Sequence, residues 1–222
     1  MNKLREILEQ PVKKAGISFA ELVTRWQAAV VPSLKTSTAD VYNNAIRLYL
    51  LPAFGDKDIS TINREAVELF LAKQARTYCR STLAIMRVAL LKLFGWALSN
   101  ELVEKNVVSR VKLPKAGKRV QRAVLTPEQV RALASKLREP YATLVLFLAI
   151  TGLRISEALA VQHSDIRGNI LHVSRRVYHG TIDSLKTDNS ERMLPLPDSL
   201  YRESGRYRVA ETGFLGVGKE RR

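Results

Sequence analysis

The chain has 222 residues, in which 36 lysines and arginines outnumber 21 aspartates and glutamates and give a formal net charge of +15. This length allows one large or two small domains with a hydrophobic core, and the positive surplus favours nucleic acid as a partner over a merely soluble basic protein. With one cysteine, Cys79, and three histidines, the sequence excludes an internal disulfide and a four-ligand Cys/His zinc site of the usual spacing.

Neither a signal peptide nor a membrane span is predicted from the sequence. The N-terminus, Met1-Asn-Lys-Leu-Arg, has no apolar stretch, and the longest apolar run, Tyr141 to Ile150, is about half of what a bilayer requires. We therefore expect a protein of a reducing cytosol that has no membrane partner.

The N-terminal part begins with a polar arm, residues 1–16, before the first helical pattern. Ser18-Phe-Ala-Glu21 has the spacing of a capping box, in which a hydroxyl and a carboxylate three residues later satisfy free amides at a helix start. This predicts a helix to about Val30, ended by Pro32.

A second helical pattern starts near Ser37 and is expected to end where Pro52 and Gly55 follow. Its apolar stripe consists of Val41, Ala45 and Leu48, with Tyr42, Ile46 and Tyr49 beside it. The spacing of three and four residues predicts one buried face.

Two further amphipathic segments complete a predicted four-helix bundle. Asn63 opens one of them, whose buried face is predicted to carry Val67, Phe70 and Leu71. The other runs from Ser81 to about Leu98, and its core stripe is Leu83, Met86, Leu90, Phe94 and Ala97. Arg80 and Arg87 beside these helices are candidate DNA contacts, although an ordinary solvated face explains them equally well.

A basic linker follows the bundle, because no acidic residue lies between Glu104 and Glu128. Its candidate DNA contacts are Lys112, Lys115, Lys118, Arg119 and Arg122. Such a stretch can lie along phosphates and release counterions without reading base sequence. The alternative is a plain solvated linker.

The second domain is predicted to open at Thr126-Pro-Glu-Gln129, which supplies a hydroxyl cap, proline at the first helical position and a carboxylate near the positive helix end. An apolar helix follows over 141–150, then Gly152 and a helix through Leu159. From Ile170 onward the apolar period changes to that of two or three short strands, which implies a small antiparallel sheet.

Arg154 is the first candidate for chemistry, because it follows an apolar helix and a glycine turn. A guanidinium between apolar walls can grip a phosphate with two parallel bonds and stabilise added charge on it. Glu157 lies three residues later and can pair with Arg154 on a helix. That ion pair without any further role is the alternative interpretation.

Several motifs together resemble those of the tyrosine-type site-specific recombinases, the family of phage integrases. Thr151-Gly-Leu-Arg-Ile-Ser-Glu157, followed by Asp165-Ile166 and a strand, resembles the family's first arginine motif. Leu51-Pro-Ala-Phe-Gly55 with Trp96-Ala97 is similar to the core-binding domain, and Leu125-Thr-Pro-Glu128 to the opening of the catalytic domain. The segment from Leu185 to Leu196 resembles the β-hairpin that carries the family's minor-groove lysine, here Lys186. The resemblance covers roughly residues 17–198.

The resemblance implies a reaction without metal, cofactor or ATP, in which a tyrosine attacks a DNA phosphodiester and leaves a 3′-phosphotyrosyl link that a 5′-hydroxyl later displaces. Arg154 would hold the scissile phosphate, Glu157 would orient Arg154, and Lys186 would give a proton to the leaving 5′-oxygen. For Lys186 the alternative is a solvated lysine in a hairpin turn. Arg192 in the same hairpin segment is a further candidate DNA contact.

Other parts of the family pattern are missing from this sequence. No His-x-x-Arg motif follows Lys186, and the tyrosines after it, Tyr201 and Tyr207, come too soon to be the nucleophile. His172-Val-Ser-Arg175 has the letter spacing of that motif but lies in a predicted strand, where residues three apart face opposite sides.

The resulting expectation is a mainly α protein with a helical SAM-like core-binding domain and a partial α+β catalytic domain that has a small antiparallel sheet. The segments are an arm at 1–16, the core-binding domain at 17–110, a basic linker at 111–124, the partial catalytic domain at 125–200 and a divergent, disordered or frameshifted tail at 201–222. We expect a C-terminally truncated integrase of bacterial or phage origin that works in the cytoplasm at the nucleoid. It would bind double-stranded DNA, as a homo-oligomer in the family manner, and take no small-molecule substrate. The alternatives are a non-catalytic DNA-binding regulator that competes with a full-length integrase, and an unstable pseudogene product.

Overall fold

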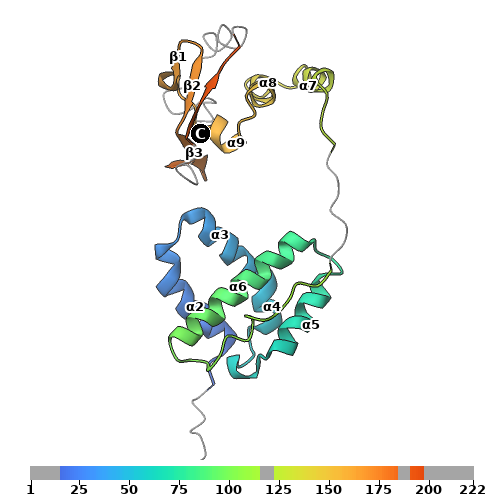
Figure 1. Ribbon diagram of the computed structural model, residues 1–222, viewed down its shortest axis with the longest axis vertical. Helices are drawn as coiled ribbons and strands as arrows, with labels where there is room; N and C mark the ends of the chain where they lie inside the picture. The colour runs from blue at the N-terminus through green and yellow to red at the C-terminus, as the bar shows by residue number, and fades with distance from the viewer. Residues whose placement is uncertain (1–15, 116–122, 185–190, 198–222) are drawn as a thin grey trace, which may run out of the picture. The chain divides into compact units, whose positions relative to one another are not determined.

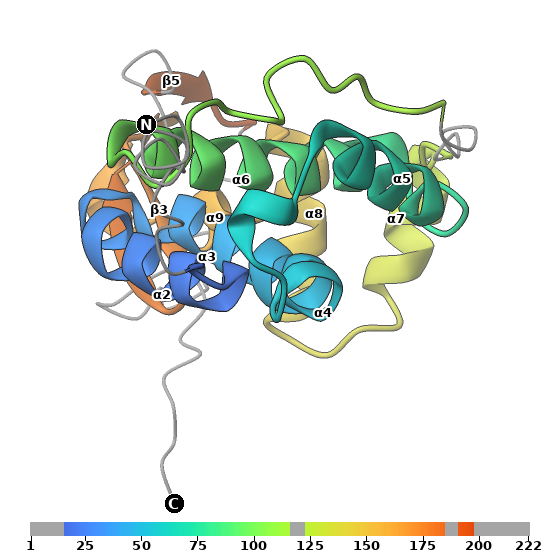
Figure 2. The same cartoon turned by 90° about the horizontal axis from the view of Figure 1, so that it is seen from below.

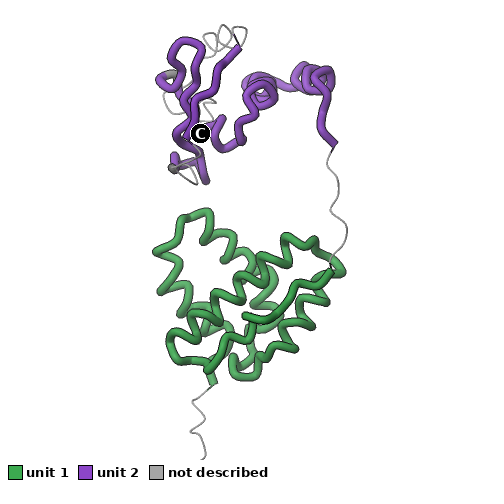
Figure 3. Tube along the Cα trace, in the orientation of Figure 1, with its two compact units in different colours: residues 1–121 green, residues 122–222 purple. Residues whose placement is uncertain are grey.

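The computed structural model describes residues 16–115, 123–184 and 191–197. The chain divides into two compact units, residues 1–121 and residues 122–222 (Figure 3). The fold is mainly α, with a helical first unit and a smaller α+β second unit that contains short antiparallel strands.

Among the described residues of unit 1, the first helix is α2 (Phe19–Val30), which begins where the capping pattern predicts it. The backbone N–H of Glu21 donates to the Ser18 hydroxyl at 3.1 Å, so one free amide at the helix start is satisfied. The predicted second half of the capping box is replaced by an ion pair, since the Glu21 carboxylate accepts from Arg25. Pro32 lies in the short 3-10 turn η1 (Val31–Ser33) that follows, as the predicted helix end requires.

The second predicted helix is longer than expected, because it continues through Pro52. It consists of α3 (Thr36–Ala45), a π-helical turn η2 (Ile46–Leu50) and α4 (Leu51–Phe54), and it ends at Gly55. Proline has no N–H to donate within a helix. The wider π-turn immediately before Pro52 is the kind of irregularity that accompanies such an interruption.

The predicted apolar stripe of this helix is partly wrong. Val41 and Leu48 are exposed, whereas Ala45 is buried as predicted. The buried side chains of the run are Ala39, Ala45, Ile46, Leu50 and Phe54. The segment is apolar on more than one side, so spacing alone did not select the face, and packing buried the one with Ile46 and Leu50.

The remaining helices of unit 1 agree with the predictions. After the short 3-10 turn η3 (Ile59–Thr61), Asn63 caps α5 (Arg64–Gln74), and its side chain accepts from the Ala66 N–H at 2.8 Å. The predicted core residues of α5 and of α6 (Arg80–Ser99) are all buried.

Helix α6 is the centre of unit 1 and packs against α2, α3 and α5 (Figures 1 and 2). It is the one helix among the described residues that is long and apolar enough to cross a membrane by length and composition. Its apolar stripe is instead part of the bundle core, where the ring centroids of Phe94 and Phe19 lie 6.5 Å apart. This is typical of a core helix in a globular domain.

Unit 2 opens with α7 (Pro127–Ala134), which has the predicted cap: Thr126 and Gln129 satisfy each other's backbone amides. The apolar helix α8 (Tyr141–Thr151) follows, then the one-turn helix α9 (Ile155–Ala158) and the 3-10 turn η4 (His163–Asp165). The predicted pair of helices around Gly152 is therefore present, with α9 much shorter than its predecessor.

Five short strands follow in the part of unit 2 that the structure describes, where two or three were predicted. β1 (Ile166–Arg167), β2 (Ile170–Val173) and β5 (Arg192–Pro195) form an antiparallel sheet in the order β1-β2-β5. β3 (Arg175–Tyr178) and β4 (Thr181–Ser184) form a separate hairpin. In the register of the first sheet Val173 lies opposite Arg192, so β5 returns along a strand whose Leu171 and Val173 are buried in the unit 2 core.

Candidate functional site

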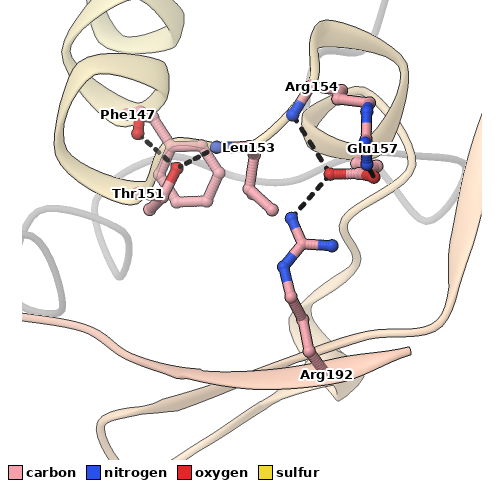
Figure 4. A network of polar contacts seen from close by, with 6 residues as sticks. All are labelled: Phe147, Thr151, Leu153, Arg154, Glu157 and Arg192. Carbon is pink, nitrogen blue, oxygen red and sulfur yellow. Dashed lines mark hydrogen bonds and ion pairs between the residues drawn. The ribbon is translucent and has the colours of Figure 1, made fainter. Parts of the chain in front are cut away.

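The site begins at the turn between α8 and α9 (Figure 4). Gly152 ends α8 with φ of +65°, a left-handed conformation that favours glycine. The Thr151 hydroxyl donates to the Phe147 carbonyl at 2.6 Å and accepts from the Leu153 N–H at 3.4 Å. Leu153 is buried, so the turn is anchored from both sides and places Arg154 at the N-cap of α9.

A Gly152→Ala substitution tests this turn. The added methyl group would meet no atom within 4 Å, so its cost is only the left-handed backbone, about 1 kcal/mol of unfolding free energy. Thermal denaturation of the two proteins measures it. Gly152→Asn is the control and should lose less, because asparagine tolerates this conformation. Equal losses for alanine and asparagine would show that backbone conformation is not the cause.

Glu157 is the buried centre of the site. Its side chain is 3% exposed, and its two carboxylate oxygens accept three hydrogen bonds. Oε1 accepts from Arg154 Nη1 at 2.8 Å, and Oε2 accepts from the Arg154 backbone N–H at 3.1 Å and from Arg192 Nη2 at 2.8 Å. Burial by itself raises the pKa of Glu157, but the bonds from Arg192 and Arg154 outweigh it and lower the pKa to about 2.

Arg154 itself is exposed. The expectation that apolar walls surround its guanidinium is wrong, because the side chain is 73% exposed and only its partner Glu157 is buried. The ion pair expected from the spacing is present, yet it leaves most of the guanidinium facing outward. A buried anion that holds an exposed cation is an arrangement that can present the cation to a phosphate.

The contact between Arg192 and Glu157 was not predicted from the sequence. Arg192 comes from β5 and reaches the Glu157 carboxylate (Figure 4), with 31% of its side chain exposed. The two residues are 35 positions apart, so no local spacing could have shown the contact. From the sequence, only the position of Arg192 in the predicted hairpin segment indicated a role, that of a DNA contact.

A second arginine network lies beside the first and is structural in character. Arg175 Nη2 donates to both Asp165 oxygens at 2.7 and 2.8 Å and to Gln162 Oε1 at 2.7 Å, and its Nε donates to the Ala160 carbonyl at 3.2 Å. His172, on β2, instead lies 2.8 Å from Glu191. His172 and Arg175 therefore have separate partners, in agreement with the prediction that their spacing is a coincidence.

The other candidate DNA contacts are spread over unit 1 and the linker. Arg80, Lys112 and Lys115 are exposed. Arg87 holds the segment after α6, since its Nε donates to the Val111 carbonyl at 2.6 Å. The remaining candidates, Lys118, Arg119, Arg122 and Lys186, lie outside the described residues.

Comparisons with known proteins agree with the resemblance seen in the motifs. Residues 18–73 match the model of the phage integrase N-terminal SAM-like domain. An integrase of Mycobacterium phage FRAT1 is 25% identical over 200 residues, which cover 85% of this chain and 58% of the relative. An integrase of Streptomyces ambofaciens is 25% identical over 214 residues, covering 88% and 54%. The chain thus spans about half the length of the curated relatives it matches.

Solved structures share the fold. A lambda integrase dimer bound to a COC′ core site matches with a TM-score of 0.73 at 14% identity, over 90% of this chain and 57% of that chain. The Tn1549 transposon integrase in complex with a circular intermediate DNA matches with a TM-score of 0.68 at 18% identity, over 86% and 65%. These matches extend over both units.

Proposed function

We propose that this chain is a phage integrase-like tyrosine recombinase, in keeping with its matches, and that it binds duplex DNA and holds a backbone phosphate with Arg154. The observation that carries this proposal is the exposed Arg154 guanidinium, fixed from behind by the buried Glu157 carboxylate. A fixed, outward-facing cation fits the charge that builds on a phosphate under attack.

We assign Glu157 the role of orienting Arg154. Its carboxylate accepts from both the backbone N–H and the side chain of Arg154, so it fixes the base and the tip of that side chain together. Because the pKa of Glu157 is lowered to about 2, the carboxylate is fully ionised near neutral pH, where the protein would bind DNA.

The rest of the chain contributes general affinity for DNA. We propose that residues 17–110 are the core-binding domain, that the basic linker at 111–124 lies along phosphates, and that residues 125–200 carry the catalytic motifs. The exposed Lys112 and Lys115 and the net charge of +15 support this, because each phosphate contact releases counterions and adds affinity. We therefore propose that the chain works in the bacterial cytoplasm, at the nucleoid.

The DNA-cleaving reaction implied by the resemblance needs a tyrosine nucleophile and Lys186, in addition to Arg154 and Glu157. A tyrosine oxygen would form a bond to phosphorus while the bond to the 5′-oxygen breaks, and Lys186 would give that oxygen its proton. No histidine follows Lys186 in these 222 residues. We therefore propose that this polypeptide grips DNA without forming the covalent link by itself. The relatives described above are integrases, so a regulatory role has no separate support.

Two measurements test the proposal. Fluorescence anisotropy with a labelled duplex should show binding that weakens steeply as salt rises, with a slope of about −0.9 per phosphate contacted. Incubation with a nicked suicide substrate, which traps any covalent intermediate, should give no protein–DNA adduct on denaturing gels. Salt-independent or absent binding would refute the DNA-binding function, and an adduct would refute the lack of cleavage.

A further inference from the structure

We propose that Arg192 is a positioning residue that acts on Arg154 through Glu157 and does not contact DNA itself. This inference rests on the proposed function of Arg154. It changes the role expected for Arg192 from the sequence, which was that of a DNA contact.

Arg192 is less accessible to a ligand than Arg154 is. Arg192 is 31% exposed and donates to a carboxylate that is 3% exposed, whereas Arg154 is 73% exposed. Both guanidiniums donate to this carboxylate, but the more exposed Arg154 can take a phosphate as a second partner while it keeps that charge-assisted bond. Of the two arginines, Arg154 is therefore the one placed for DNA.

Arg154 and Arg192 share the Glu157 carboxylate. Arginine and a carboxylate prefer a bidentate pair, with two parallel N–H···O bonds. Here Arg192 donates to Oε2, so the Arg154 side chain is left with Oε1. Without Arg192, Oε2 would keep only the bond from the Arg154 backbone N–H, and its vacated acceptor position would draw the Arg154 fork onto Glu157 and away from a ligand.

Arg192 comes from a different part of unit 2 than Arg154 does. It lies on β5, which is paired with β2 opposite the buried Val173, and it follows Lys186 by six residues in the sequence. The Glu157 carboxylate thus joins the helix turn that carries Arg154 to the strand that follows the Lys186 segment. Two motifs of the proposed site, far apart along the chain, are linked by one hydrogen-bonded anion.

A double-mutant cycle tests the proposal: the wild type, Arg192→Gln, Arg154→Ala and the double variant, each titrated with a labelled duplex over a range of salt. We expect Arg192→Gln to weaken binding about threefold or more in the wild-type background and to have little effect once Arg154 is alanine. Its salt slope should fall toward that of Arg154→Ala, because Arg154 is then no longer held at the phosphate, and the double variant should show no further fall. Arg192→Lys, which keeps the charge, should recover part of the affinity.

The control is Arg167→Gln, which removes an exposed arginine from β1 of the same sheet and should leave the Arg154 effect unchanged. Additive losses, together with a salt slope that falls by about a further 0.9 when Arg192→Gln is added to Arg154→Ala, would identify a direct phosphate contact and overturn the proposal. Unchanged binding in Arg192→Gln would overturn it as well.

A measurement without DNA separates this inference from the proposed function. Carbon-13 NMR of the Glu157 carboxyl should show that Arg192→Gln raises the pKa from its low value near 2, whereas Arg167→Gln should not. If Arg154→Ala left DNA binding unchanged, the proposed function would fail, and this titration would still report whether Arg192 holds Glu157. An unaltered Glu157 titration in Arg192→Gln would overturn the positioning role.

Discussion

Replacing Glu157 by alanine is expected to lower the unfolding free energy of unit 2 by about 3–5 kcal/mol, the usual cost of breaking a buried ion pair by removing one partner. The carboxylate is almost fully buried and accepts from Arg154 and from Arg192. Its loss leaves two guanidiniums facing each other with no anion between them. A change of this size is a large part of the stability of a small domain.

Hydrogen exchange measured by mass spectrometry is the suitable readout, because both tryptophans, Trp26 and Trp96, lie in unit 1 and would not report on unit 2. Exchange should accelerate in α8, α9 and the β1-β2-β5 sheet but not in the helices of unit 1. Glu191→Ala is the matched control, since it removes an exposed carboxylate that pairs only with His172 among the described contacts. If both alanine variants exchanged alike, the buried network would not be stabilising.

The same carboxylate makes unit 2 sensitive to acid. The pKa of Glu157 falls from an ordinary value of 4.5 to about 2 in the folded protein, so its contribution to stability is complete above pH 4.5 and is lost as pH falls toward 2. The loss is on the order of 3 kcal/mol. Glu157→Gln, which has no carboxyl to titrate, should flatten this part of the stability profile. An unchanged profile in Glu157→Gln would assign the acid sensitivity to other groups.

Replacing Arg154 by alanine is expected to weaken duplex binding roughly 10- to 100-fold, because a charge-assisted bond to phosphate is worth about 1.5–3 kcal/mol. The salt slope should fall by about 0.9, the amount that one lost phosphate contact predicts. The fold should survive, because Glu157 keeps its bond to Arg192. Arg154→Lys should lie between the wild type and alanine, since lysine keeps the charge but cannot form a bidentate contact.

Arg131→Ala provides the control for exposure and charge. Its side chain on α7 is also 73% exposed and also pairs with a glutamate, Glu128, but it is not part of the Glu157 network. Anisotropy titrations should show at most about a twofold loss for it, the effect of removing one general positive charge. If Arg154→Ala and Arg131→Ala weakened binding equally, Arg154 would be one basic residue among many and the proposed phosphate site would be wrong.

Features that depend on neighbours in sequence were predicted well. The caps at Ser18, Asn63 and Thr126 are each formed with an amide three residues later. The pair between Arg154 and Glu157 is of the same kind. Within one helical turn, residue spacing determines which groups can meet, so the sequence sufficed for these contacts.

Features that depend on which surface packs against which were predicted poorly. Val41 and Leu48 had helical spacing but lie on the exposed side of a helix that is apolar on more than one side. Arg154 was expected between apolar walls and is exposed. In both cases the sequence gives the residue type but not the element that comes to cover it.

By itself, the sequence determined the helical first unit, the turn at Gly152, the Arg154–Glu157 pair and the resemblance to phage integrases, because these depend on local spacing and short motifs. Only the tertiary structure decided the partner of Arg192. That contact spans 35 residues and exists because β5 pairs with β2 and so comes to lie beside α9 in the folded unit. Long-range pairing of this kind follows from the packing of whole elements, which spacing along the chain does not encode.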